Sequence, residues 1–138
     1  MKIIIKWFIR FLPFAYMLLI WVLSSLPSNA VVELPDLSVD RFIKESLHLV
    51  EFAILYLLLV AALLTTGRFS IKLSMVCAVI AIVYGALDEF HQSFVPYRSA
   101  TLIDFVKDFI GVVVASYFVH KNFRKNGFIR IRNYFSSN

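Results

Sequence analysis

The chain has 138 residues, of which 60% are hydrophobic and 17% are charged, and its mean hydropathy is +0.79. A soluble domain carries about a quarter charged residues and about half apolar ones, so this composition excludes an ordinary soluble globule. The net charge of +5 comes from basic residues that border apolar segments, which argues against nucleic acid as a partner and favours a membrane surface. The single cysteine, Cys77, excludes an internal disulfide.

Four apolar segments predict the fold class. Each is close to the ~20 residues that a helix needs to cross a hydrocarbon core. They span approximately residues 7–26, 47–66, 71–91 and 101–120. We therefore predict an all-α membrane protein, a four-transmembrane-helix bundle, in which residues 1–120 form a single membrane domain and residues 121–138 form a basic cytoplasmic tail.

The connections between these segments have the composition of loops. Residues 27–44 contain Pro27 and Pro35, and we expect them to form a loop, as we do residues 93–100. Gly67 is expected to end the second helix. The basic start, the apolar stretch and the small residues near position 30 also resemble a cleavable signal peptide, which is an alternative reading of the first segment.

The distribution of lysine and arginine predicts the orientation. With four helices, ten of the fourteen basic residues fall on one side: Lys2, Lys6, Arg10, Arg68, Lys72, Lys121, Arg124, Lys125, Arg130 and Arg132. Cytoplasmic loops and termini carry such an excess, so both termini are expected in the cytoplasm.

Charged residues interrupt the apolar runs at the helix ends opposite the side that carries most of the basic residues. The uncharged stretches 52–66, 73–87 and 109–119 are too short for a ~30 Å core at ~1.5 Å per residue. Extending these three helices adds polar residues at the outer end in each case. They are Lys44, Glu45, His48 and Glu51; Asp88, Glu89, His91 and Gln92; and Asp104, Lys107 and Asp108.

We expect these polar residues to line a water-accessible, outward-facing cavity, because an ionisable group inside a membrane costs roughly 2.5–3.5 kcal/mol. Several of them are spaced to share one helix face. These are Lys44 with His48, His48 with Glu51, Glu89 with Gln92, and Asp104 with Asp108 and Gly111. Gly85 and Gly111 are expected to let neighbouring helices approach closely beneath the site.

A structural role for the same charges is the alternative, for instance pairing of Arg98 with Glu89 or Asp104. A metal site is not expected, because di-metal bundles use the Glu-x-x-His element twice and this chain has it once, at Glu45 and His48. We likewise expect no cofactor. The chain has no glycine-rich phosphate loop and no G-x-S-x-G motif, so no catalytic residue is assigned.

The arrangement of these residues resembles the VanZ-like family, known from a protein linked to teicoplanin resistance. The matching elements are Trp21 with Ser24-Ser25-x-Pro27, Lys44-x-x-x-His48, and Tyr84-Gly85-x-x-Asp88-Glu89-x-x-Gln92-x-Phe94-x-Pro96-x-Arg98, followed by Asp104 and Gly111. The similarity covers approximately residues 15–118. The chain departs from the family pattern at Tyr97, where glycine is usual, and at Asp108, where asparagine is usual. Glu51 is also unusual at its position.

The resemblance implies a multi-pass protein of the bacterial cytoplasmic membrane that lowers sensitivity to glycopeptides, without an agreed biochemical activity. Our first hypothesis is that the outer cavity binds the head group of a lipid or peptidoglycan precursor. Arg98 and Lys44 would hold phosphate or carboxylate groups by charge-assisted hydrogen bonds. The candidate ligand-binding residues are Lys44, His48, Glu89, Gln92, Arg98, Asp104 and Asp108.

Two other functions remain open on the sequence. The clustered carboxylates, with His48 or His91, are suited to acid–base chemistry in an intramembrane hydrolase or transferase acting on a lipid-linked substrate. A scaffold subunit, whose charges meet partner helices, is the third. The oligomeric state and the ligand are left unassigned.

Overall fold

The structure is a computed structural model that contains four α-helices. It describes residues 2–27, 37–96, 98, 101–123 and 134, and of residues 37–45 and 48 it describes the backbone alone. The helices are α1 (Lys2–Ser24), α2 (Leu37–Leu64), α3 (Ile71–Gln92) and α4 (Leu102–Asn122). The prediction of an all-α, four-helix chain is confirmed.

The first connection differs from the prediction, because α2 begins at Leu37 and residues 37–44 are helical. No glycine or proline occurs between Leu37 and Leu64, so nothing in this stretch forces the backbone out of a helix. The loop prediction is therefore wrong for residues 37–44, which extend the helix, while residues 28–36 lie outside the described residues.

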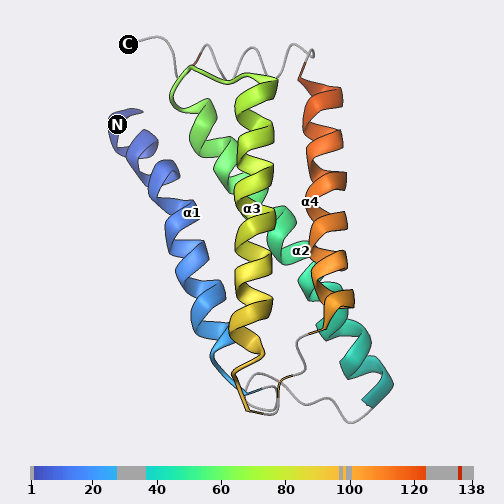
Figure 1. The fold of residues 1–138 in the computed structure, drawn as a ribbon. Helices are drawn as coiled ribbons and strands as arrows, with labels where there is room; N and C mark the ends of the chain where they lie inside the picture. Colours follow the sequence, from blue (N-terminus) through green and yellow to red (C-terminus); the bar gives the residue numbers. More distant parts are fainter. Residues whose placement is uncertain (1, 28–36, 97, 99–100, 124–133, 135–138) are drawn as a thin grey trace.

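The helices run alternately up and down, so that each end of the bundle is formed by ends of all four helices (Figure 1). The C-terminal ends of α1 and α3 and the N-terminal ends of α2 and α4 lie together, and we call this the polar end. The start of α1, the end of α2, the start of α3 and the end of α4 lie at the other end, which we call the basic end. The polar residues of α3 and α4 are therefore gathered at one end, as predicted.

Helix α2 forms the centre of the bundle and packs against each of the other three helices. In Figure 1 it runs obliquely behind α3, from the space between α1 and α3 at the basic end to below α4 at the polar end. Its buried apolar side chains recur at helical spacing and form one stripe. They are Phe52, Leu55, Tyr56, Val60 and Leu64, which pack with Ile20 of α1, Ala81 of α3 and Val112 of α4.

The turn between α2 and α3 follows the sequence prediction. Gly67 has a φ of 71°, a left-handed conformation that glycine adopts without steric cost, and α2 ends just before it. Ser70 then caps α3, because its side chain accepts a hydrogen bond from the backbone N–H of Leu73 at 3.2 Å. The expected helix end at Gly67 is confirmed.

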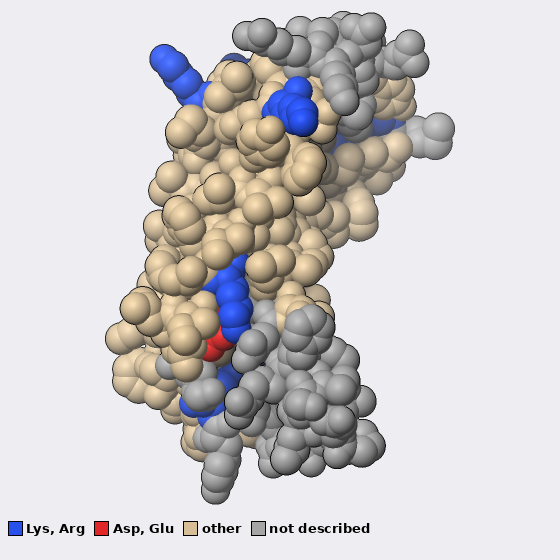
Figure 2. All heavy atoms as spheres, turned by 90° about the vertical axis from the view of Figure 1, so that its right-hand side faces the viewer, with Lys and Arg blue, Asp and Glu red and all other residues tan. Residues whose placement is uncertain are grey.

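The outer surface of the bundle is apolar over much of its length. Two helices, α1 and α3, are long and apolar enough to cross a membrane, while α2 contains a shorter apolar stretch, Leu49–Leu64. Large apolar side chains such as Phe14, Leu18 and Val79 are exposed. Figure 2 shows one face whose middle part carries no charged residue, with Lys and Arg groups above and below it. Water-soluble monomers rarely expose so large a contiguous apolar area, so lipid is the expected surrounding.

Gly111 allows α4 to approach the backbone of α2. A Cβ atom at Gly111 would overlap the carbonyl oxygen of Leu49 and would lie 3.0 Å from its carbonyl carbon. At Gly85, by contrast, a Cβ atom would make ordinary contacts at 3.5 Å with Asp108 and Phe52. The predicted close approach is therefore confirmed at Gly111, whereas at Gly85 there is room for a methyl group.

We expect Gly111→Ala to destabilise the bundle and Gly85→Ala to leave it nearly unchanged. The methyl group at position 111 meets rigid backbone, and such overpacking typically costs about 1–3 kcal/mol. The measurement is the midpoint of thermal or denaturant unfolding of the purified protein in detergent, followed by circular dichroism. Equal midpoints for the two variants would contradict the close approach of α4 and α2.

Candidate functional site

Gln92, the last residue of α3, joins α3 to α1. Its Nε2 atom donates hydrogen bonds to Asp88 Oδ2 at 2.6 Å and to Ser24 Oγ at 3.3 Å. All three side chains are buried. Asp88 and Gln92 meet because they lie four residues apart on one face of α3, and Ser24 is the last residue of α1. Gln92, predicted to bind a ligand, thus has a structural contact as well.

A second set of contacts holds α1 against α3. The indole of Trp21 stacks on the imidazole of His91 with ring centroids 4.0 Å apart, and Ser25 Oγ lies 3.0 Å from His91 Nε2. About two turns of α3 farther from the polar end, the hydroxyl of Tyr84 donates to the carbonyl oxygen of Met17 at 2.7 Å. The sequence analysis singled out Trp21 and Ser25 as residues like those of the family. Their contacts with α3 give them a physical role.

Arg98 caps the C-terminal end of α1. Its Nη1 atom donates hydrogen bonds to the carbonyl oxygens of Leu23 at 2.9 Å and Leu26 at 3.2 Å. The last carbonyls of a helix lack partners within it, so a cation here satisfies them and opposes the negative end of the helix dipole. Arg98 interacts electrostatically with Glu51 and Glu89, but within the described part of the chain it forms no ion pair with a carboxylate.

Asp104, in the first turn of α4, is held on both carboxylate oxygens. The hydroxyl of Thr101, the N-cap residue, accepts a hydrogen bond from the Asp104 backbone N–H at 3.2 Å and donates one to Oδ2 at 2.6 Å. This reciprocal arrangement joins the N-cap residue to the first turn of α4. Lys107 Nζ lies 3.3 Å from the other oxygen, Oδ1. Asp104 therefore helps to begin α4 and to fix its direction.

Three carboxyl groups are buried together at the polar end. Asp88, Glu89 and Asp108 have exposed fractions of 1%, 8% and 0%. Asp108 interacts electrostatically with Glu89 and Asp88, and also with Glu51 and Asp104. The predicted stripe on α4 is confirmed, because Asp108 and Gly111 are buried and Asp104 is partly buried. Removing a charge from water costs several kcal/mol unless partners compensate for it. The surroundings of this cluster must therefore supply hydrogen-bond donors or positive charges.

Asp88 carries an acceptor that the described residues leave unused. Its Oδ2 atom is bound to Gln92, but its buried Oδ1 atom has no hydrogen-bond partner among the described residues. Buried polar atoms in proteins are almost always paired, so an orphan acceptor indicates a donor supplied from elsewhere, either a ligand or a water molecule. The sequence prediction omits Asp88 from the binding residues, although its spacing of four from Gln92 was a usable signal.

Lys44 and His48 lie in the N-terminal half of α2, which extends to the polar end (Figure 1). Their side chains lie outside the described residues, so their proposed roles stay predictions. Within the described part of the chain, no three His, Cys, Asp or Glu side chains are placed to hold a metal ion.

We expect Arg98→Gln to loosen the last turn of α1. The N–H groups of Ser25 and Leu26 bond to carbonyls of this turn, and Arg98 binds the carbonyls of Leu23 and Leu26. A hydrogen bond to a charged group contributes about 1.5–3 kcal/mol, so hydrogen exchange of these amides should become about ten-fold faster. The measurement is hydrogen–deuterium exchange of a peptide covering residues 21–27.

Lys107→Gln is the matched control for this prediction. It removes the same charge from the same end of the bundle, but Lys107 pairs with Asp104 on its own helix. Exchange in residues 21–27 should remain at the wild-type rate. If both variants accelerate exchange equally, or neither does, Arg98 does not cap α1.

Comparison with known proteins identifies a family. The family profile described as VanZ/LLP1 matches residues 3–124, which includes all four helices. No curated protein and no solved structure matches the chain significantly.

Proposed function

The chain belongs to the VanZ/LLP1 family, and on that basis we propose that it is a four-span membrane protein whose polar end binds the head group of a lipid or of a cell-wall precursor. The family is linked to teicoplanin resistance, and its members are membrane proteins. Teicoplanin is a glycopeptide, and glycopeptides bind cell-wall precursors at the outer face of the membrane. A protein that contacts the same precursors from within the membrane would account for the link.

The orientation that we propose places the polar end outside the cell. The basic end carries Lys2, Lys6, Arg10, Arg68, Lys72 and Lys121. All nine Asp and Glu residues, in contrast, fall within residues 33–51 and 88–108. An excess of Lys and Arg marks the cytoplasmic side of membrane proteins, so the carboxylates face outward, at the depth of the lipid head groups.

The contacts of Arg98 and Lys107 indicate which chemical groups the proposed ligand should carry. The sequence alone suggested that Arg98 holds a phosphate or carboxylate group. In the described residues, however, Arg98 donates to the carbonyls of α1, and Lys107 is paired with Asp104. The groups that this part of the site can offer to a ligand are therefore mainly hydrogen-bond acceptors. We propose a ligand that offers hydrogen-bond donors, namely the hydroxyl, amide or ammonium groups of a sugar or peptide head group.

The single observation that carries this proposal is the buried Oδ1 atom of Asp88, which lacks a donor among the described residues. A hydrogen bond from a ligand to an ionised carboxylate is of the stronger, charge-assisted kind. Gln92 supports the same carboxylate from the other side and so fixes its orientation. A donor-bearing head group at the polar end would complete this set of hydrogen bonds.

Trp21 offers a reporter for the binding experiment, because it stacks on His91 at the polar end. The chain has two tryptophans, so Trp7→Phe leaves Trp21 as the sole source of tryptophan fluorescence. In nanodiscs, this variant would be titrated with a lipid-linked disaccharide-peptide precursor, and separately with the same lipid pyrophosphate lacking the disaccharide-peptide. We expect the complete precursor to bind and change the fluorescence, with binding about ten-fold weaker after Asp88→Asn.

Asp104→Asn is the matched control, because it removes one negative charge from the same end while its oxygens are already bonded to Thr101 and Lys107. It should weaken binding much less than Asp88→Asn. Equal effects would mean that only the overall charge matters. Equal binding of the bare pyrophosphate lipid, or no effect of Asp88→Asn, would contradict the proposal, and in the latter case a buried water serves Oδ1. Turnover of the precursor in these samples would favour the hydrolase or transferase alternative.

A further inference from the structure

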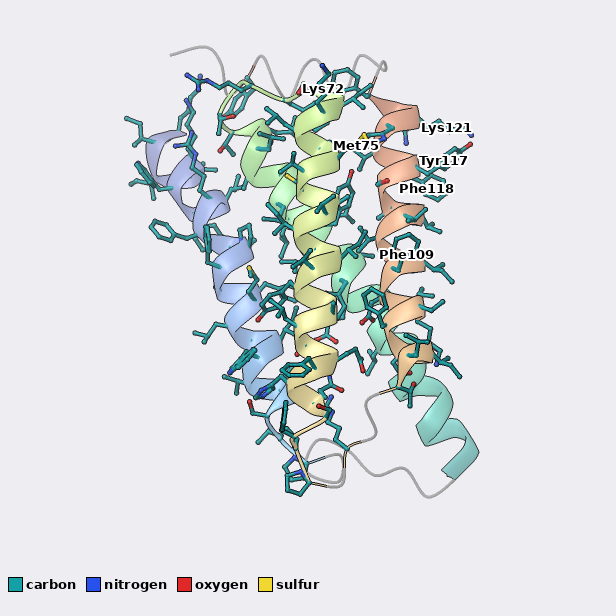
Figure 3. All side chains as sticks on the ribbon, viewed as in Figure 1. Lys72, Met75, Phe109, Tyr117, Phe118 and Lys121 are labelled. Atoms are coloured by element: carbon teal, nitrogen blue, oxygen red, sulfur yellow. The ribbon has the colours of Figure 1, made fainter. Side chains whose placement is uncertain are left out.

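Two lysines lie at a similar level of the basic end, on the neighbouring helices α3 and α4. His120 Nε2 of α4 lies 3.2 Å from Ser74 Oγ of α3, so these two positions are in contact. Lys72 and Lys121 are each within two residues of this contact and are therefore at the same level of the bundle. Both side chains are exposed. Figure 3 shows Lys72 on α3 and Lys121 on α4 near this end.

Neither lysine has a carboxylate partner among the described residues. Every Asp and Glu of the chain falls within residues 33–51 or 88–108, and those that the structure describes lie toward the polar end. Lys121 Nζ is 5.7 Å from the centre of the Tyr117 ring, a favourable contact that leaves its charge uncompensated. The N-terminus of α3, one residue before Lys72, adds the positive end of a helix dipole. This part of the surface is therefore suited to an anion.

The surface next to these lysines is apolar. Met75 on α3 and Phe118 on α4 are 57% and 55% exposed, and Tyr117 and Phe109 are also exposed on α4. Figure 3 shows these side chains following one another down the two helices from Lys72 and Lys121. A ligand that fits this surface has a negative charge at one end and hydrocarbon at the other.

We propose that Lys72 and Lys121 bind the head group of an anionic phospholipid, with an acyl chain lying against Met75 and Phe118. An ammonium group binds phosphate by charge-assisted hydrogen bonds, and basic residues next to the hydrocarbon region attract anionic lipids. A free phosphate would use the lysines but not the apolar surface beneath them, so the combination favours a lipid. This site is separate from the polar end and does not depend on the function proposed there.

The experiment measures lipid selectivity of the full chain in nanodiscs of phosphatidylcholine containing a small fraction of phosphatidylglycerol. Native mass spectrometry after release into detergent counts the phosphatidylglycerol molecules that stay bound. We expect the wild type to retain phosphatidylglycerol and the double variant Lys72→Gln, Lys121→Gln to bind it about ten-fold more weakly. Lys72→Arg with Lys121→Arg should retain binding, because the charges remain.

The matched control is Lys2→Gln with Lys6→Gln, which removes the same charge from the same end but on α1. It should change retention by less than about two-fold. Equal loss in both double variants would show attraction to the basic end as a whole, which would overturn a site at α3 and α4. Unchanged retention in Lys72→Gln, Lys121→Gln, or displacement of the lipid by inorganic phosphate, would overturn it as well. Lys2, Lys72 and Lys121 are exposed and Lys6 is partly exposed, so circular dichroism should show unaltered folding.

Discussion

A carboxylate inside an apolar helical bundle is stable only where charges or hydrogen-bond donors replace the water that it has lost. Asp88 and Asp108 are fully buried, and the structure at the polar end is organised around this requirement. Gln92 donates to Asp88 and at the same time to Ser24, so satisfying the carboxylate also attaches α1 to α3. Arg98 then caps α1 from the segment between α3 and α4. The position of α1 thus depends on the polar groups of the other helices.

The two ends of the molecule differ in the charges that they carry. The carboxylates lie toward one end, where α1, α3 and the start of α4 are tied together, and the described part of the other end carries cations alone among its charged residues. Between them, large apolar side chains are exposed on all four helices. A bundle with this distribution suits a membrane whose inner leaflet is anionic and whose outer face presents head groups rich in hydroxyl and amide donors. Both proposed binding sites follow from this separation of charge.

Much of this arrangement was predictable from the sequence, and the exceptions have physical reasons. Apolar runs and their charged limits predicted four helices and the gathering of polar groups, since helices of similar length in an antiparallel bundle bring alternate ends together. The start of α2 at Leu37 was missed because a helix that continues into polar sequence has no apolar signature. The contacts of Arg98 were unpredictable because its acceptors are backbone carbonyls, which every residue possesses.

The two glycines also show a difference that the sequence could not predict. Gly85 and Gly111 look alike in sequence, yet one faces side chains that leave room for a methyl group and the other faces the backbone of Leu49. Only the packing of α4 on α2 distinguishes them. Similarly, Asp88 is a candidate binding residue because Gln92 reaches only one of its two carboxylate oxygens. The geometry of one turn of α3 decides which oxygen that is.

The claim on which the account depends most is that the polar end faces the outside of the cell and the basic end faces the cytoplasm. It can be measured by labelling intact cells with a membrane-impermeant maleimide, in a Cys77→Ala background that removes the one native cysteine. Ser93 is exposed at the polar end and Thr66 at the basic end. We predict that Ser93→Cys is labelled in intact cells and that Thr66→Cys is labelled only after the cells are permeabilised. The reverse pattern would contradict the account.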